Sequence, residues 1–210
     1  MVALAALLLA GGESRRMGAL KPLLPWGPPN RPGEPAQTLI EYQLVQLAHL
    51  PADHIVVVLG HRADQLLPVV RRAGAVAVVN ELYTEGRASS VRVGAAALPE
   101  DTQTLVILNV DQPRPSTIIE HLVDEHRAGR NLITVPVYEG QRGHPLVLDG
   151  CLLPELRQVQ EATQGVRALL TRHHGRVAEV PFDSPLVLLD INRPEEYDRA
   201  RATFFQQVRP

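Results

Sequence analysis

The chain has 210 residues, 45% of them apolar and 21% charged, and its formal net charge at pH 7 is −2. This length allows one sizeable core but not two full-sized domains, so we expect a single domain over residues 1–210. The near-neutral charge excludes a general nucleic-acid coat, and the one cysteine, Cys151, excludes an intrachain disulfide and a cysteine-based zinc site.

The longest apolar run, Val2–Ala10, begins the predicted elements. It is about half as long as a membrane-spanning helix and ends in adjacent glycines rather than a cleavage site, so we interpret its core, Ala3–Leu9, as a buried strand. With no targeting segment visible, we expect a cytoplasmic protein without a membrane partner. Trp26–Pro35 predicts an exposed, mobile loop because it is rich in Pro and Gly. Thr38 can then cap a helix that runs to about His49.

Three further apolar runs predict strands at Ile55–Leu59, Val76–Val79 and Leu105–Val110. They are nearly continuous rather than alternating, as expected for strands that are covered on both faces. Ser116 can cap the helix that follows. The apolar face of that helix is formed by Ile119, Leu122, Val123 and His126.

The last third of the chain is less regular. Ile133–Val135 predicts a strand, and Val137–Leu148 predicts a loop and a short strand that leave the main sheet. Cys151–His174 predicts two short helices on either side of a glycine break. Leu186–Leu189 predicts another buried strand. Pro194 suits the first position of a final helix, one face of which carries Tyr197, Ala200 and Phe204.

Alternating strands and helices indicate a three-layer, Rossmann-like α/β fold with a mostly parallel sheet. In such sheets, ligands bind beyond the carboxyl ends of the strands, near the point where the strand order reverses. We therefore expect a site formed by residues that follow strands. These are Ala10–Lys21 after the first strand, Asp111–Pro113 after the fourth and Asp190 after the last.

The segment AGGESRRMGALK, residues 10–21, indicates phosphate binding. Glycines let the backbone approach oxyanions and point N–H donors at them. The segment also carries a hydroxyl group and positive charges, on Ser14, Arg15, Arg16 and Lys21. Its adjacent glycines match neither the dinucleotide fingerprint nor a Walker A loop. Lys21 is the only lysine in the chain, which favours a requirement for an ammonium group there. A tight strand–helix turn without a ligand is the alternative.

The pattern G-G-x-S-x-R-M-G-x-x-K resembles the signature loop of the molybdopterin-dinucleotide nucleotidyltransferases, within the nucleotidyltransferases that activate sugars and alcohols with NTPs. Further blocks follow in the expected order: KPLLPWG at 21–27, GRASSVRVG at 86–94, VDQP at 110–113, RGHPLVL at 142–148 and LLDINRPEEY at 188–197. The later blocks are most similar to the molybdenum cofactor cytidylyltransferase branch. The resemblance implies an NTP-transferase domain that joins CMP from CTP to the terminal phosphate of molybdopterin and releases pyrophosphate.

The resemblance also implies roles for individual residues. Lys21 and Arg16 act in catalysis, and Mg²⁺ binds Asp111 and Asp190, because transfer between two anions requires charge neutralisation. The acceptor contacts Ser89, Ser90 and His144, and a molybdenum hydroxylase is a candidate acceptor protein. The nucleotide contacts Leu9, Ala10, Gly11, Gly12, Glu13, Ser14, Gly18, Asn80 and Gly86.

Several of these assignments have a structural alternative. Asp111 can form a turn before a proline, and Asp190 can cap the final helix. Ser89 and Ser90 can cap a helix, and His144 can be a structural or exposed loop residue.

Two features depart from the cytidylyl pattern. Residues 161–167 read EATQGVR where that branch usually carries Gly-Asp-x-Gly-Ala-Arg, so the Gly-Asp pair is missing. The first loop begins Ala-Gly-Gly, as often in the guanylyl branch, and Gly12 leaves room for a purine. GTP as the nucleotide, a sugar or alcohol phosphate as the acceptor, and a non-catalytic nucleotide-binding chaperone are therefore the alternatives.

Overall fold

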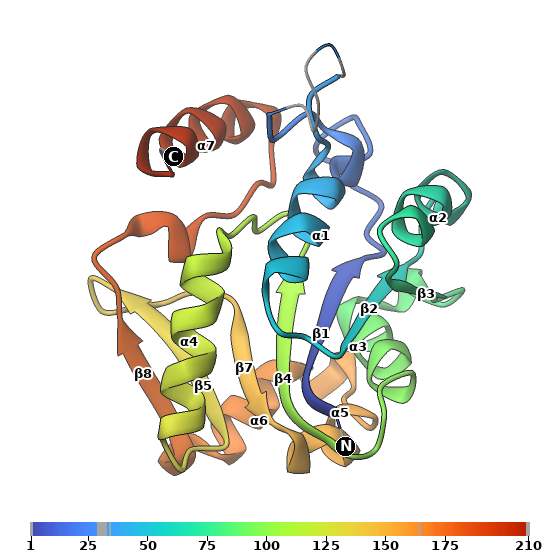
Figure 1. The fold of residues 1–210 in the computed structure, drawn as a ribbon. Helices are drawn as coiled ribbons and strands as arrows, with labels where there is room; N and C mark the ends of the chain where they lie inside the picture. The colour runs from blue at the N-terminus through green and yellow to red at the C-terminus, as the bar shows by residue number, and fades with distance from the viewer. Residues whose placement is uncertain (1, 29–32, 34, 164, 209–210) are drawn as a thin grey trace.

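An eight-stranded sheet forms the centre of the computed structural model, which describes residues 2–28, 33, 35–163 and 165–208 (Figure 1). The strand order is β3-β2-β1-β4-β7-β5-β6, and β8 pairs with β5. Strands β1 to β4 are parallel to their neighbours in this group, whereas β7 is antiparallel to both β4 and β5. The strands are β1 (Val2–Ala10), β2 (His54–Leu59), β3 (Val76–Val79), β4 (Thr102–Asn109), β5 (Ile133–Tyr138), β6 (Gln141–Arg142), β7 (Leu146–Asp149) and β8 (Val177–Pro181).

Helices cover both faces of the sheet, which confirms the three-layer α/β fold. One face carries α1 (Leu39–His49), α2 (Ala63–Arg72) and α4 (Ser116–Ala128). The last helix, α7 (Pro194–Gln207), joins the same hydrophobic cluster through Phe204, which packs on Tyr42 of α1. The other face carries α3 (Arg87–Ala96), α5 (Leu153–Leu156) and α6 (Val166–Arg172). Among the described residues, no helix is both long and apolar enough to cross a membrane.

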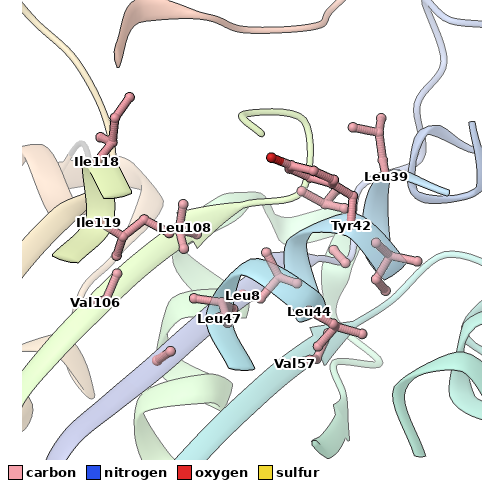
Figure 2. Packing of buried hydrophobic residues seen from close by; sticks show 14 of the residues in the cluster. Leu8, Leu39, Tyr42, Leu44, Leu47, Val57, Val106, Leu108, Ile118 and Ile119 are labelled. Carbon is pink, nitrogen blue, oxygen red and sulfur yellow. The ribbon is translucent and has the colours of Figure 1, made fainter. Parts of the chain in front are cut away.

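The alternation of side chains along β1 explains the two cores. Leu4 and Leu8 belong to the cluster under α1 and α4, and Ala5 and Leu7 belong to the cluster under α3. All four side chains are fully buried, as their continuous apolar sequence predicts. Figure 2 shows the first of these cores, where Leu8 of the sheet lies beneath the leucines of α1.

The predicted helix starts are correct in α1 and α7 but wrong in α4. Thr38 accepts a hydrogen bond from the Glu41 amide, and its own amide donates to the Glu41 carboxylate, so the two form a capping box. Ser116 is instead the first helical residue of α4, and Pro115 precedes it as the cap. The Ser116 amide donates to Gln46 of α1 at 2.9 Å, so a tertiary contact replaces the expected side-chain cap.

Two strand predictions for the last third of the chain are wrong. The apolar run Leu186–Leu189 forms most of a 3₁₀ helix, η6 (Pro185–Leu188), because Pro185 occupies its first position and the Ser184 hydroxyl accepts from the Leu186 amide. The strand of this part of the chain is β8, which lies earlier, at Val177–Pro181. It was not predicted because it is partly exposed and lacks a continuous apolar run. Within residues 137–148, β7 does not leave the sheet but inserts between β4 and β5.

The loop predicted over Trp26–Pro35 is not exposed where it begins. Trp26 is fully buried, and its ring packs edge-on against Phe204 of α7 with 5.2 Å between ring centroids. The aromatic residues of α7 therefore hold the chain just after the glycine-rich loop. Residues 29–32 and 34 of this predicted loop lie outside the described residues.

The strand order reverses between β1 and β4, which lie side by side at the centre of the sheet. The carboxyl end of β1 leads into the glycine-rich loop, and that of β4 leads to Asp111. The loop predicted to bind phosphate and the carboxylate of Asp111 predicted to bind metal therefore both follow strands at the switch point of the sheet.

We predict that Gly143→Ala destabilises the fold by about 1–3 kcal/mol, as an overpacked core site does. Gly143 follows β6, and a Cβ there would overlap the carbonyl oxygen of Val187, which is backbone and cannot move aside like a side chain. Gly175→Ala is the control, because a Cβ at Gly175 would meet nothing within 4 Å. Urea unfolding of both variants tests this, and equal stabilities would contradict the packing argument.

Candidate active site

A cavity of about 320 Å³ lies where the carboxyl ends of β1 and β4 meet. Of the residues expected in the site, it is lined by Leu9, Ala10, Gly11, Gly12, Ser14, Lys21, Gly86, Ser90 and Asp111. Tyr83, Arg87 and Asn109 also line it, although they were not among the predicted site residues. The structure thus brings the start of the glycine-rich loop, the lysine and one carboxylate to a single cavity.

The glycine-rich loop is folded back on itself by Ser14. This residue has a left-handed backbone with φ of 55°, a conformation that is strained for any residue but glycine. Its carbonyl oxygen accepts from the Met17 amide at 2.9 Å, and its hydroxyl oxygen accepts from the Lys21 amide at 3.2 Å. The turn therefore delivers Lys21 to the cavity.

Lys21 forms an ion pair with Asp111. Its Nζ donates to the Asp111 carboxylate at 2.9 Å and to Oδ1 of Asn192 at 3.2 Å, and the residue is only 9% exposed. Asn192 lies in the LLDINRPEEY block but was not selected from the sequence. Because the carboxylate of Asp111 faces the lysine, it does not act as the local turn cap that was the alternative.

Asp190 lies near Asp111 but does not follow a strand as expected. It follows η6, and it does not cap α7, whose N-cap is Arg193. Partial burial and the carboxylate of Asp111 raise the pKa of Asp190, whereas the ammonium of Lys21 lowers it. Two carboxylates that repel each other in this way favour a bound cation.

The pair fits a divalent metal that also has phosphate ligands. Mg²⁺ typically uses one or two carboxylates and completes its shell with water and substrate phosphates. Among the described residues, no group of three or more His, Cys, Asp or Glu side chains could hold a metal ion. Asp111 and Asp190 would therefore hold a metal together with the nucleotide rather than in a closed protein site.

A fully buried arginine connects the segments around these carboxylates. Arg114 donates to the carbonyl oxygens of Pro113 and His144 at 2.8 and 2.9 Å, and to those of Val187 and Leu189 at 2.8 and 3.0 Å. Burial lowers its pKa to about 9, and the negative charges of Asp190 and Asp111 oppose that shift. Sequence reasoning missed Arg114, although a charged residue between two prolines after a buried strand was an available signal.

A second cavity, of about 620 Å³, adjoins the first. Its polar lining is mainly cationic, with Arg87, Arg142 and Arg167, and it also includes His144 and Glu161. Arg87 alone of the described lining residues belongs to both cavities. The second cavity is therefore suited to an anionic molecule next to the first.

His144 lines the second cavity, where the acceptor was expected. Its Nδ1 is buried and has no hydrogen-bond partner among the described residues. Burial, together with the charges of Arg87, Arg114 and Arg167, lowers its pKa to about 3. The imidazole is thus neutral at physiological pH.

Asn80 and Ser89 lie behind the cavity wall instead of in it. The Asn80 amide donates to the hydroxyl oxygens of Ser89 and Ser90 at 2.8 and 3.0 Å. The Ser89 hydroxyl can donate to the carbonyl oxygen of Gly86, 2.8 Å away. These bonds support the start of α3. Ser90, expected at the acceptor, lines the first cavity, and α3 begins at Arg87, so neither serine is its N-cap.

Three of the site residues expected in the glycine-rich loop do not line the cavity. Arg16 and Gly18 are exposed. Glu13 forms an ion pair with Arg15 at 2.5 Å. The structure therefore does not bring Glu13, Arg16 or Gly18 to the first cavity, although Arg16 was expected to be catalytic.

Known proteins are similar to this chain in sequence and in fold. The family model described as the MobA-like NTP transferase domain matches residues 6–177. The chain is 32% identical over 172 residues to nicotine blue oxidoreductase of Paenarthrobacter nicotinovorans, covering 78% of this chain and 79% of that protein. It is 24% identical over 205 residues to the molybdenum cofactor cytidylyltransferase of Escherichia coli K12, covering 97% and 98% of the two chains.

Solved structures share the fold over nearly the whole chain. The manganese complex of Rv0371c from Mycobacterium tuberculosis H37Rv matches with a TM-score of 0.71 and 24% identity, and covers 95% of this chain and 98% of that chain.

We predict that His144 makes the folded state less stable as the pH falls from about 6.5 towards 3. The unfolded chain takes up a proton on this histidine below its ordinary pKa of 6.5, whereas the folded chain does so only near 3. Urea unfolding between pH 7.5 and 4.5 should give a shallower pH dependence for His144→Gln than for the wild type. The exposed His174→Gln is the control, and an unchanged slope for His144→Gln would refute the prediction.

Proposed function

The chain belongs to the MobA-like NTP transferase family, and we propose that it transfers the CMP group of CTP to the terminal phosphate of molybdopterin and releases pyrophosphate. The relative named as a molybdenum cofactor cytidylyltransferase, which aligns over nearly both whole chains, supports this pair of substrates. The observation that carries the proposal is the cavity in which the glycine-rich loop, Lys21 and Asp111 meet, with a cationic second cavity beside it.

The reaction needs no protein nucleophile. An oxygen of the acceptor's phosphate forms a bond to the α-phosphorus of CTP, and the bond from that phosphorus to the β-bridging oxygen breaks. The electron pair leaves with pyrophosphate. The attacking oxygen is already anionic, so the protein must align two anions and neutralise charge rather than remove a proton.

The residues of the first cavity match this requirement. The backbone of Gly11 and Gly12 can approach the phosphates, since neither carries a side chain. Lys21 supplies the ammonium that stabilises the leaving pyrophosphate. In the structure this ammonium is held on Asp111, so it is already at the edge of the cavity.

Mg²⁺ is the proposed metal, held by Asp111 and Asp190 with the phosphates of CTP. When bound, it would neutralise charge on the triphosphate. A manganese complex of a protein with this fold supports a divalent ion in general. The raised pKa of Asp190 beside Asp111 supports the same pair of ligands.

The cationic second cavity is the proposed acceptor site. Arg142 and Arg167 line it and can pair with phosphate oxygens. His144 also lines this cavity and is neutral there, so it can form a hydrogen bond with the polar ring of the acceptor. A phosphorylated, polar molecule such as molybdopterin fits this lining.

Two other activities are favoured by single observations. A Cβ at Gly12 would meet nothing within 4 Å, so the base side has room for a purine and GTP is the second nucleotide candidate. The relative named as an oxidoreductase is more identical to this chain than the cytidylyltransferase is. Oxidoreduction is therefore the second reaction candidate.

The experiment that tests the proposal is a nucleotide panel with a molybdopterin source. CTP, GTP, ATP and UTP are compared by kcat/KM for pyrophosphate release at fixed Mg²⁺, and we expect CTP to lead. A higher value for GTP moves the activity to guanylyl transfer. Tight NTP binding without pyrophosphate release favours a chaperone, and consumption of nicotine blue without pyrophosphate release favours an oxidoreductase.

We predict that the two partners of the Lys21–Asp111 ion pair differ in their effect on metal binding. Asp111→Asn removes a ligand and should weaken Mn²⁺ binding about 10-fold or more, as losses at metal sites do. Lys21→Ala should not weaken Mn²⁺ binding, because the lysine competes for that carboxylate, but should lower kcat by about 10²-fold. Mn²⁺ titration followed by electron paramagnetic resonance measures the first effect.

The exposed Asp124→Asn serves as the control for this pair of variants. Equal Mn²⁺ affinities in Asp111→Asn and Asp124→Asn would place the metal elsewhere. Wild-type turnover by a folded Lys21→Ala protein would remove the lysine from the mechanism.

A further inference from the structure

Arg87 stands at the junction of the two cavities. It is the first residue of α3, and it is the one described residue that lines both the cavity of the glycine-rich loop and the cavity of His144. Arg87 is exposed, so its side chain can contact a ligand in either cavity. Arg87 lies in the GRASSVRVG block, but the assigned site residues of that block were Gly86, Ser89 and Ser90.

An arginine is electrostatically unfavourable in this position. The N-terminus of a helix carries a partial positive charge, which disfavours a cation there. The first turn of α3 contains no acidic residue of its own to offset this. A residue that opposes the local helix preference is more readily explained by a role in the site than by stability.

The compensating carboxylate comes from far along the chain. Glu161, in the 3₁₀ helix η4 (Glu161–Thr163), accepts a hydrogen bond from the Ala88 amide at 2.8 Å. Its carboxyl carbon would lie 2.6 Å from a Cβ at Gly86, so Gly86 leaves the space that the carboxylate fills. With φ of 109°, Gly86 also has a backbone that other residues rarely adopt. The segment that lacks the Gly-Asp pair therefore still delivers an acidic group, and delivers it next to Arg87.

The charges around Arg87 come from both cavities. The protein packed around the guanidinium lowers its pKa, while the carboxylates of Asp111, Asp190 and Glu161 act in the opposite direction. Arg167, in the second cavity, adds to the lowering. Arg87 therefore lies within electrostatic reach of the carboxylate pair on one side and of the acceptor cavity on the other.

The guanidinium of Arg87 also differs from that of Arg114. Arg114 uses its donors on carbonyl oxygens of the fold. Among the described residues, by contrast, none accepts a hydrogen bond from the side chain of Arg87. Its planar fork of donors is thus available to a ligand and can bind two oxygens at once.

We propose that Arg87 is a catalytic residue that contacts the acceptor's phosphate and the α-phosphate of the NTP at the same time. This rests on the proposed nucleotidyl transfer. In that reaction the acceptor's phosphate oxygen bonds to the α-phosphorus as the bond to the pyrophosphate oxygen breaks, so two anions must approach each other. A cation between them reduces their repulsion and stabilises the charge that builds up on the non-bridging oxygens of the α-phosphate.

The test compares Arg87→Met and Arg87→Lys with Arg92→Met. Arg92 lies on the same helix, lines neither cavity and donates to the Val159 carbonyl oxygen, so its replacement is the matched control. The binding probe is radiolabelled inorganic phosphate, measured by equilibrium dialysis on protein saturated with Mg²⁺ and α,β-methylene CTP. Pyrophosphate release with a molybdopterin source is measured in parallel, and circular dichroism verifies the fold of each variant.

We expect Arg87→Met to weaken phosphate binding about 10-fold or more, as for a lost hydrogen bond to a charged group. The dissociation constant of the Mg²⁺-bound nucleotide should change less than threefold, and kcat should fall about 10²-fold or more. Arg87→Lys keeps the charge but not the fork, so its kcat should lie between those of the wild type and Arg87→Met. Arg92→Met should match the wild type in all three measurements.

Phosphate affinity and kcat of Arg87→Met within threefold of the wild type would overturn the proposal. So would a full recovery by Arg87→Lys, because a shared contact to two phosphates requires the fork. Failure of the proposed function is seen separately, as a wild type that releases no pyrophosphate with any NTP. In that case the phosphate titration still decides whether Arg87 binds an anion beside the nucleotide.

Discussion

The guanidinium of Arg114 is the interaction on which the geometry of the site depends. It is fully buried, and its donors reach carbonyl oxygens of three separate segments, at Pro113, at His144 and at Val187 with Leu189. A buried cation is tolerated only where its donors are satisfied and opposite charge is near. The fold meets the first condition with backbone oxygens. It thereby fixes the turn after β4, the turn before β7 and the end of η6 relative to one another.

The second condition is met by the two carboxylates of the site. Asp111 and Asp190 favour the charged form of Arg114, and Lys21 pairs with Asp111 at 2.9 Å. Their negative charge therefore supports the buried arginine in the free protein and would support a metal in the loaded one. This dual use accounts for carboxylates that remain close together although they repel each other. A site organised in this way needs little rearrangement when anionic substrates enter it.

The sequence predicts those parts of the molecule whose signal is local. Continuous apolar runs identify β1 to β4, and the glycine-rich loop follows from residue types adjacent in the chain. Leu186–Leu189 misleads because an apolar run of that length is equally compatible with a 3₁₀ turn, which Pro185 and Ser184 impose. Arg87, Arg114 and Asn192 were missed for a different reason. The partners that give them their roles, such as Lys21 for Asn192 and Val187 for Arg114, lie tens of residues away in the chain, so a local pattern does not reveal those roles.

The reversed direction of β7 has a consequence for how the site can change. The first cavity is lined mainly by residues at or after the carboxyl ends of β1, β3 and β4, whereas His144 precedes β7 and reaches the same edge because that strand runs antiparallel to β4. The glycine-rich loop and His144 thus belong to separate parts of the sheet, and no described residue of β5, β6 or β7 lines the first cavity. Substitutions around His144 can therefore alter the second cavity while the lining of the first stays the same.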